Sequence, residues 1–207
     1  MTTPAEHVRQ ERPGKVAIMR AAVTVMGEDG YEGASMRDMA ARAGVSVAAV
    51  YYHFPSKLHL LREFLDEAYD VILARLDRRL LRAGPTAGER LDEAVGTLIA
   101  SYLHDEFARL ASNVAWREYT RLDPPERRAI DLKRRKIMHL FEDVIADGVV
   151  SGEFSAEEPK EAARAVVILC TSLVEPFDEM ERTMDEVITL YQGFARSIAS
   201  PRGCSPR

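Results

Sequence analysis

The segment from Ser35 to Lys57 most constrains the fold, because it reads as two short helices joined by a tight turn. The Ser35 hydroxyl is suited to cap the first helix by accepting a hydrogen bond from an amide of the first turn. Gly44 is suited to end that helix, since glycine adopts the left-handed conformation without a steric penalty. Ser46 is then the cap of a second helix, predicted over about residues 47–53. A helix, a glycine-containing turn and a helix make up the helix-turn-helix motif, whose second helix enters the major groove of DNA.

The rest of the chain shows the periodicity of helices. Apolar residues recur at spacings of three and four, and no segment alternates as a half-buried strand would. The predicted fold is all-α, with an N-terminal three-helix helix-turn-helix domain over residues 1–57 and a C-terminal helical-bundle domain over residues 58–207. The other expected helices cover about residues 14–28, 58–82, 106–122, 126–150, 158–175 and 180–198. One more begins at Thr86 or Ala87, and its inward face is expected to hold Leu91, Ala94, Val95, Leu98 and Leu103. The first is expected to bury Val16, Met19, Val23 and Met26 and to end at Gly30.

Charge is distributed unevenly along the chain. The formal net charge is −5 over 207 residues. Residues 1–57 hold seven basic and six acidic side chains, a balance of +1, and the remaining 150 residues hold 21 basic and 27 acidic side chains, a balance of −6. Attraction to DNA must therefore come from the local placement of a few basic groups and from two copies of the chain.

Several other classes of protein are disfavoured. The two cysteines, Cys170 and Cys204, have no metal-binding spacing and suggest no disulfide framework. The N-terminus is polar, and no run of about 18 apolar residues occurs, so we expect a cytoplasmic protein without a membrane span. No phosphate loop, nucleophile elbow or cluster of metal ligands is present. We therefore expect no enzymatic activity, no metal and no cofactor.

The stretch from Gly30 to Leu61, GYEGASMRDMAARAGVSVAAVYYHFPSKLHLL, strongly resembles the DNA-binding region of TetR-type repressors, and the match begins at about Lys15. The shared positions are Gly30, Tyr31, Ser35, Ala40, Gly44, Val45, Ser46, Tyr51, His53, Phe54, Ser56 and Lys57. The resemblance implies a homodimeric transcriptional repressor that binds double-stranded operator DNA and is released by a small, largely apolar ligand. It also implies that the helix over residues 58–82 carries the ligand signal to the DNA-binding domain.

The residues expected to contact DNA are Arg37, Ser46, Val47, Ala48, Ala49, Tyr51, Tyr52, His53 and Lys57. Arg37 and Ser46 suit phosphates, and the resemblance gives Lys57 the same role. Val47, Ala48 and Ala49 offer only methyl groups, so a larger share of specificity is expected from DNA shape. Tyr51 also fits a half-buried core position, and His53 an ordinary surface position. Arg9 and Arg12 suit either a DNA-contacting arm or a disordered tail.

The ligand is expected to lie among apolar and aromatic residues of the C-terminal domain: Tyr102, Phe107, Trp116, Tyr119, Met138, Phe141, Leu169 and Phe177. Each of them also fits plain core. The helix after residue 126 is rich in basic residues, which suit either a solvated face or a pocket mouth that meets phosphates. The stretch REYTRLDPPERRAIDLKRRK resembles the branch of the family that senses acyl-CoA thioesters. The alternative is a regulator of an efflux or antibiotic gene that senses a drug-like hydrophobic compound.

The last two expected helices, at about 158–175 and 180–198, carry apolar seams that include small residues. From the residues alone, the seams fit an intramolecular core as well as a dimer interface. The resemblance favours the interface, as a four-helix bundle between two subunits. An enzyme with a helical fold and an architectural DNA-binding protein without an effector are the other two classes. The first lacks a nucleophile–base pair, and the large acidic second domain disfavours the other.

Overall fold

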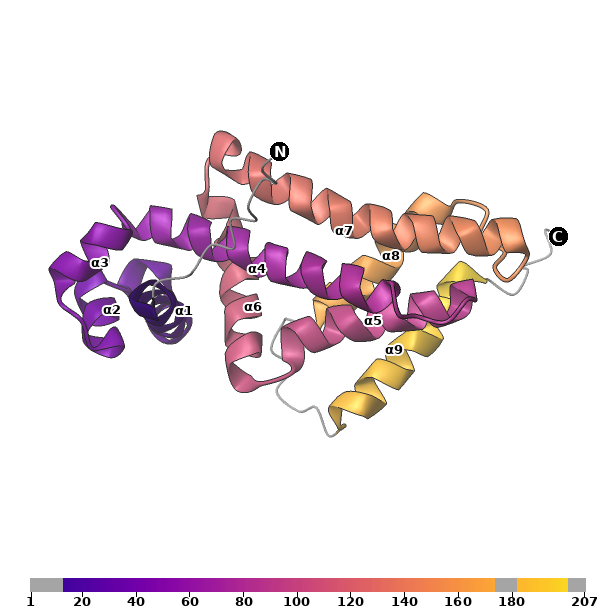
Figure 1. The fold of residues 1–207 in the computed structure, drawn as a ribbon, viewed down its shortest axis with the longest axis horizontal. Coiled ribbons are helices and arrows are strands. Elements are labelled where there is room, and N and C mark those ends of the chain that lie inside the picture. Colours follow the sequence, from indigo (N-terminus) through magenta and orange to yellow (C-terminus); the bar gives the residue numbers. More distant parts are fainter. Residues whose placement is uncertain (1–12, 174–181, 201–207) are drawn as a thin grey trace, which may run out of the picture. The chain divides into compact units, whose positions relative to one another are not determined.

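The computed structural model describes residues 13–173 and 182–200, whose only regular secondary structure is helical, with no strand among them. The elements follow one another as shown in Figure 1. They are α1 (Pro13–Gly33), α2 (Met36–Ala43), α3 (Val47–His53), α4 (Lys57–Leu80), α5 (Ala87–Leu103), α6 (Glu106–Glu118), a 3-10 turn η1 (Tyr119–Arg121), α7 (Pro124–Ser151), α8 (Pro159–Ser172) and α9 (Met184–Ala199). The all-α fold is therefore confirmed. Arg9, Arg12, Phe177 and Cys204 lie outside the described residues.

Local capping sets the helices of the N-terminal unit. The Ser35 side chain accepts a hydrogen bond from the Asp38 amide at 3.2 Å, and Ser46 accepts one from the Ala49 amide at 3.1 Å. Gly44 ends α2 with φ 68°, the left-handed conformation that favours glycine. The bounds of α3 and the turn before it therefore agree with the prediction.

The expected buried face of α1 is correct except at one position. Met19, Val23 and Met26 are buried, but Val16 is 42% exposed, and Ile18 takes a core position instead. The assignment of α1 runs past the predicted end at Glu28 to Gly33, although Gly30 interrupts the helical backbone with φ 73°. The predicted break at Gly30 is thus present, followed by one further turn.

The chain divides into two compact units between Phe64 and Leu65, inside α4. The predicted boundary at residues 57/58 lies seven positions earlier. The difference has a physical reason, because Leu60, Leu61 and Phe64 in the first two turns of α4 are buried apolar residues. A domain that ended at residue 57 would leave these side chains without their own core.

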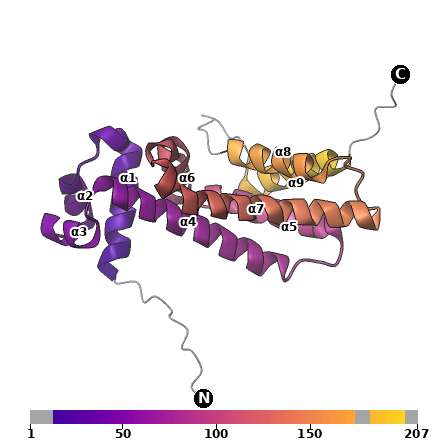
Figure 2. The same ribbon diagram turned by 90° about the horizontal axis from the view of Figure 1, so that it is seen from above.

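The C-terminal unit is a layered bundle. Its close helix pairs are α7 with α8, α5 with α9, α8 with α9, and α5 with α7 and α8. Figure 2 shows α8 and α9 side by side on one side of α5 and α7, while the part of α4 in this unit lies on the other. The apolar face predicted for α5 is confirmed, since Leu91, Ala94, Val95, Leu98 and Leu103 are all buried.

Helix ends in this unit differ from the predictions by two to four residues. The helix expected to reach residue 122 ends at Glu118 and continues as η1, and α8 ends at Ser172 instead of about 175. α9 begins at Met184 because Thr183 forms a capping box with Glu186. α7 begins two residues early, at Pro124, because Asp123 accepts a hydrogen bond from the Glu126 amide. These caps follow the rules of helix starts, and the periodicity of apolar residues alone missed them.

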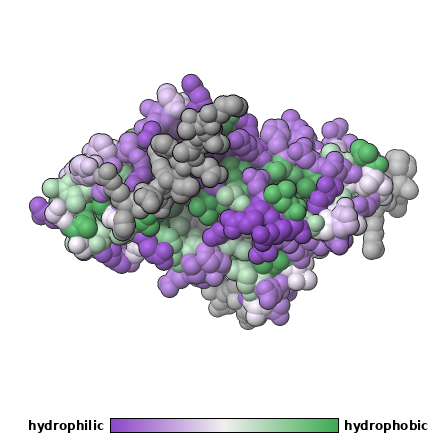
Figure 3. All heavy atoms as spheres, viewed as in Figure 1, coloured by the Kyte–Doolittle hydropathy of each residue, from purple (hydrophilic) through white to green (hydrophobic). Residues whose placement is uncertain are grey.

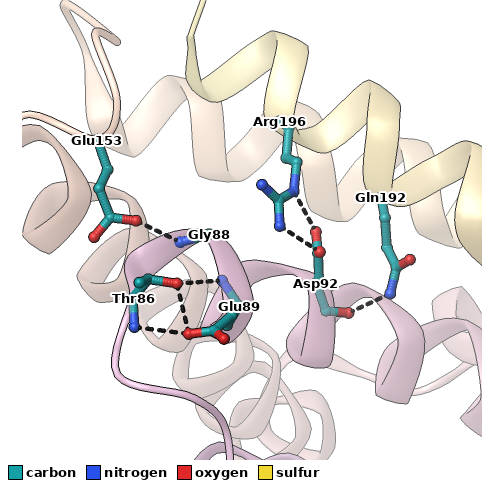
Figure 4. Close-up of polar contacts among 7 residues, drawn as sticks. All are labelled: Thr86, Gly88, Glu89, Asp92, Glu153, Gln192 and Arg196. Carbon is teal, nitrogen blue, oxygen red and sulfur yellow. Dashed lines mark hydrogen bonds and ion pairs between the residues drawn. The ribbon is translucent and has the colours of Figure 1, made fainter.

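Polar contacts between residues distant in sequence join the first part of α5 to α9 and to the turn after α7 (Figure 4). The Glu153 carboxylate accepts hydrogen bonds from the Ala87 and Gly88 amides, both at 3.0 Å, at the beginning of α5. Arg196 of α9 donates two hydrogen bonds to Asp92, at 2.8 and 2.6 Å. None of the described helices is long and apolar enough to cross a membrane.

The surface combines charged and apolar residues. On the face drawn in Figure 3, hydrophilic residues surround small groups of hydrophobic ones. Some large apolar side chains of the C-terminal unit are well exposed, namely Val71, Leu81, Trp116, Leu132, Val150, Ile168 and Phe194.

Candidate nucleic-acid interface and ligand site

One face of α3 is exposed although its side chains are largely apolar or aromatic. Tyr52 is 73% exposed, Tyr51 is 51% exposed and Val47 is 37% exposed. On the opposite face, Val50 and the capping residue Phe54 are completely buried. The helix is thus anchored by two residues and presents its tip, including exposed Ala48, to its surroundings. The half-core alternative for Tyr51 is not what the structure shows.

The polar residues expected at this surface differ in their availability. Arg37 and Ser46 are exposed, but the Ser46 hydroxyl also serves as the cap of α3. The Lys57 ammonium donates to the backbone carbonyls of Tyr31 and Ala34 and lies 4.3 Å from the centroid of the Tyr31 ring. Lys57 therefore ties the start of α4 to the end of α1, and a phosphate contact would compete with these bonds.

His53 occupies a half-buried position at the end of α3. Its ring centroid is 5.2 Å from that of Tyr52, in an edge-to-face arrangement. A Cβ built on Gly14 of α1 would lie 4.0 Å from His53 Nε2, so the imidazole packs beside the beginning of α1. Among the described residues of the N-terminal unit, Tyr52 and Tyr51 are the most exposed large apolar or aromatic side chains.

The predicted ligand residues do not form a single group. Tyr102 and Phe141 belong to the buried core of the C-terminal unit. Phe107, Met138 and Leu169 are partly buried, whereas Trp116 is 55% exposed on α6. Phe177 lies outside the described residues. Of the predicted residues, Tyr102 and Tyr119 are the ones that interact with the polar groups described next.

A cluster of phenols and charged groups, here called the tyrosine cluster, lies between α4, α5, η1 and α7. It consists of Tyr69, Tyr102, Tyr119, Asp131 and Arg134. The Tyr119 hydroxyl donates to Asp131, and Arg134 Cζ lies 4.6 Å from the centroid of the Tyr119 ring. Tyr69 interacts electrostatically with Tyr102, Tyr119 and Arg134. The cluster brings three aromatic hydroxyls and one guanidinium into the same part of the bundle.

Burial raises the pKa of the phenols in this cluster, which are protonated at neutral pH in any case. It raises the pKa of Tyr69 and, more strongly, that of Tyr102, with Tyr69 and Cys170 adding to the effect on Tyr102. Burial and the hydrogen bond to Asp131 also raise the pKa of Tyr119. Neutral phenols donate and accept hydrogen bonds, so they can bind a carbonyl oxygen as well as an anion.

Sequence reasoning missed Tyr69 and Asp131, whereas Arg134 belongs to the basic run that the sequence offers as a possible pocket mouth. The signal for Tyr69 was available, since it lies four residues after Leu65 and three before Ile72, within the apolar stripe of α4. Asp131 and Arg134 follow the buried residue Ile130 at positions that face the same side of α7. Asp131 was overlooked inside this basic run, because a run of charges usually marks a solvated face.

The basic residues of α7 have different environments. Arg127 Cζ is 5.7 Å from the Tyr119 ring centroid, on the same ring as Arg134. Lys133 is ion-paired with α4, whereas Arg128 and Arg135 are exposed. The run therefore contains two guanidiniums beside one tyrosine and does not form a uniform basic surface.

Residues 13–173 and 182–200 contain no group of three or more histidine, cysteine or acidic side chains placed to hold a metal ion. Cys170 is completely buried, and burial raises the pKa of its thiol to about 12. It is a small core residue, as the sequence predicts.

Two family models match the chain. That of bacterial regulatory proteins of the tetR family matches residues 18–64, and that of the tetracyclin repressor-like C-terminal domain matches residues 84–195. The HTH-type transcriptional repressor KstR of Mycobacterium tuberculosis is 31% identical over 138 residues, which are 67% of this chain. The match spans 61% of that relative's own length, less than two thirds.

Solved structures have the same fold. A bacterial regulatory protein in the tetR family from Rhodococcus RHA1 superposes with a TM-score of 0.83 at 23% identity, covering 91% of this chain and 98% of the other. AibR in complex with isovaleryl coenzyme A and operator DNA superposes with a TM-score of 0.76 at 21% identity, covering 91% and 98%. At these identities the likeness shows the fold alone. Since the C-terminal family model alone matches more than half of its residues, this chain belongs to the tetR family of bacterial regulatory proteins.

Proposed function

We propose that this chain is a dimeric transcriptional repressor of the cytoplasm that binds operator DNA through α3 and is released by a small, largely apolar ligand. Acyl-CoA thioesters are the first ligand class to test. The observation that carries the proposal is the exposed tip of α3, where Tyr51 and Tyr52 project from a helix anchored by buried Val50 and Phe54. Exposed aromatic side chains on a short, well-capped helix suit contact with another molecule.

Readout of DNA by α3 would rest on few direct hydrogen bonds. Val47, Ala48 and Ala49 offer methyl groups for thymine, and the two tyrosine hydroxyls reach phosphates or base edges. Arg37 supplies a charge beside the motif, and Lys57 supplies one only if it releases its backbone carbonyls. Much of the specificity would then come from DNA shape and from the spacing of two copies.

The second copy is proposed to bind at α8 and α9. Ile168 of α8 is 54% exposed and Phe194 of α9 is 44% exposed, while small residues such as Ala165 and Gly193 are exposed beside them. Buried Val166, Cys170 and Ala195 show that the other sides of these helices already serve the intramolecular core. The proposal therefore assigns the inner faces of α8 and α9 to the core and their exposed faces to the second copy.

The ligand is proposed to bind at the tyrosine cluster. Phenols that stay protonated can donate to a thioester carbonyl, and the adjoining apolar core suits an acyl chain. Arg127 and Arg134 beside Tyr119 supply positive charge for a phosphate. The relative AibR, crystallised with isovaleryl coenzyme A and operator DNA, supports this ligand class by analogy.

DNA binding is tested with a duplex selected from a random library by the wild-type protein. We expect log affinity to fall steeply with log salt concentration, with about 0.9 of slope for each phosphate contacted. Arg37→Ala should reduce this slope by about 0.9, and Tyr52→Ala should weaken binding. The matched control Arg78→Ala removes the same charge from an exposed position on α4 and should leave the slope unchanged. A flat salt titration of the wild type would contradict direct DNA binding.

The dimer face is tested by Ile168→Glu, which should shift the protein to a monomer in sedimentation velocity. Leu132→Glu is the control, because Leu132 is 53% exposed on α7 and lies outside the proposed face. A dimer that survives Ile168→Glu and Phe194→Glu together would refute this interface.

The ligand class is tested by titrating isovaleryl-CoA and a long-chain acyl-CoA while recording the fluorescence of Trp116, the single tryptophan, and the affinity for the selected duplex. Binding with loss of DNA affinity supports the proposal. If neither ester acts but drug-like hydrophobic cations release the DNA, the alternative function in efflux or antibiotic resistance replaces it.

A further inference from the structure

The way in which α4 is held in the C-terminal unit differs from that of its neighbours. Among the described residues, none of the close helix pairs in this unit includes α4. It forms one side of the bundle (Figure 2) and reaches the core through the side chains of Ile72 and Leu76, with Tyr69 and Leu73 partly buried against it. The position of α4 therefore depends on individual side chains more than on close backbone packing.

Lys133 of α7 makes three polar contacts to this part of α4. Its ammonium lies 2.6 Å from Asp66 Oδ1, 3.0 Å from the Asp66 carbonyl oxygen and 2.8 Å from Asp70 Oδ2. An ammonium group has three donors, so α4 alone supplies an acceptor for each of them. The Lys133 side chain is only 17% exposed, which limits competition from water.

The Lys133 ammonium reduces the repulsion between the two carboxylates. Asp66 and Asp70 are four residues apart and therefore lie on the same face of α4, where two like charges repel each other. Burial alone lowers the pKa of Lys133, but the hydrogen bonds and charges of Asp66 and Asp70 outweigh it and raise that pKa. The contact is thus a charged link between two helices, here called the Lys133 link.

The link adjoins the tyrosine cluster on both helices. On α7, Lys133 is next to Arg134 and two residues from Asp131, which bind Tyr119. On α4, Tyr69 lies between Asp66 and Asp70 in sequence and interacts with Arg134. A molecule that displaced Arg134 or Tyr119 would therefore act on the same turns of α4 and α7 that the link connects.

We infer that Lys133 is the coupling residue of this protein, through which a change at the tyrosine cluster moves α4. The inference rests on the proposed function, because it gives that function's ligand signal a route. Lys133 acts by positioning α4, which continues into the N-terminal unit as far as Lys57. Loss of the link should therefore uncouple the two sites while each keeps its own affinity.

Thermodynamic reciprocity allows a test without a known effector, since a ligand at one site must influence the other in both directions. In the wild type, binding of the selected duplex should change amide hydrogen exchange in α7 near residues 130–137. Lys133→Met removes the charge but keeps the length of the side chain. It should speed exchange in residues 65–80 of the free protein severalfold and abolish the duplex-induced change in α7. Lys160→Met, at an exposed position on α8, is the matched control and should do neither.

The second measurement uses isovaleryl-CoA and a long-chain acyl-CoA as probes. The wild type should lose operator affinity by about 5- to 150-fold when the ester is bound, whereas Lys133→Met should lose less than about threefold. The affinity of the variant for the ester, followed by Trp116 fluorescence, should stay within about twofold of the wild-type value. Its affinity for the duplex without ester should do the same. A variant that had merely lost its fold would lose both affinities. Asp70→Asn, which changes a 61% exposed side chain, gives a milder version if Lys133→Met does not fold.

The outcomes separate the inference from the function on which it rests. If the wild type does not bind the duplex, the proposed function fails, and the coupling role fails with it. If it binds the duplex but neither ester releases it, the ligand class is wrong, and the exchange experiment alone decides the role of Lys133. Unchanged exchange in α4, or an unchanged α7 response to DNA in both link variants, would overturn the inference.

Discussion

Both units have local helix caps, but the polar contacts within the C-terminal unit reach further along the chain than those within the N-terminal unit. In the N-terminal unit, Ser35 caps a helix through an amide three residues away, and Ser46 does the same. In the C-terminal unit, Glu153 reaches amides 65 and 66 residues away, and Gln192 and Arg196 reach Asp92 over 100 and 104 residues.

The reach of a contact along the chain decides whether it can be predicted from the sequence. A cap or a turn depends on neighbouring residues, so its chemistry is visible in a short segment. A long-range contact depends on which helices meet, and a segment does not contain that information. Substitutions at Phe54, Gly148, Ser46 and Glu153 test this contrast between local and long-range contacts.

The core of the N-terminal unit should be highly sensitive at Phe54, which is completely buried. Phe54→Ala removes most of a buried aromatic side chain and should lower the free energy of unfolding by about 3–5 kcal/mol. Tyr52→Ala, at a 73% exposed position two residues earlier, should change it by about 0.5 kcal/mol or less. Chemical denaturation at one fixed protein concentration measures both. Equal losses would mean that the anchored and exposed faces of α3 have been confused.

Close packing between α5, α7 and the turn after α7 should make Gly148 intolerant of a side chain. A Cβ there would lie 2.1 Å from Phe154 Cδ2 and 2.9 Å from Ala87 Cβ. Gly148→Ala should therefore destabilise the protein by about 1–3 kcal/mol despite the better helix propensity of alanine.

Gly96→Ala is the control for that substitution. Its Cβ would lie 3.4 Å from Ile188 Cγ2, an ordinary contact distance. The variant should be neutral or gain up to about 1 kcal/mol, measured by the same denaturation experiment. Similar losses at both glycines would show that the packing around Gly148 is looser than described.

The local cap of α3 should have a smaller effect. Ser46→Ala removes the acceptor for the Ala49 amide and should lower the free energy of unfolding by about 1 kcal/mol. Ser197→Ala, where the hydroxyl donates to a carbonyl inside α9 and caps nothing, should be neutral or slightly stabilising. If Ser46→Ala is equally silent, the turn and not the cap determines where α3 begins.

The long-range cap of α5 should give the smallest effect, and one that depends on pH. Hydrogen bonds from the Ala87 and Gly88 amides lower the pKa of Glu153. A carboxylate with a lowered pKa stabilises the fold above the unfolded value of about 4.3, and this contribution disappears as pH falls through the folded value. Glu153→Gln should therefore melt below the wild type at pH 7 and approach it below about pH 4.

Glu157→Gln, at an exposed glutamate four residues later, is the control for the pH experiment. Thermal melts of this variant should follow the wild type at every pH. A difference between Glu153→Gln and the wild type that persists unchanged in acid would show that the effect does not arise from the charge.

The helix-turn-helix segment and the position of α3 could be predicted from the sequence, since Ser35, Gly44 and Ser46 act on their immediate neighbours. The all-α class could be predicted from the spacing of apolar residues. The sequence also identified the buried face of α5, because a regular stripe of leucine and alanine has only one way to face a core. The prediction that Val16 is buried was wrong, because one apolar residue at the start of a helix can lie beyond the core that its periodicity suggests.

The contacts between polar residues of different helices could be seen only in the tertiary structure. Helix packing determines three sets of interactions: that of Tyr69 with Arg134, that of Lys133 with Asp66 and Asp70, and that of Glu153 with the beginning of α5. The same holds for the division at Phe64, where buried side chains of α4 extend the N-terminal core past the predicted boundary. The physical reason is common to these cases: capping and periodicity act over a few residues, whereas a charge on a long helix is satisfied by whichever helix packs beside it.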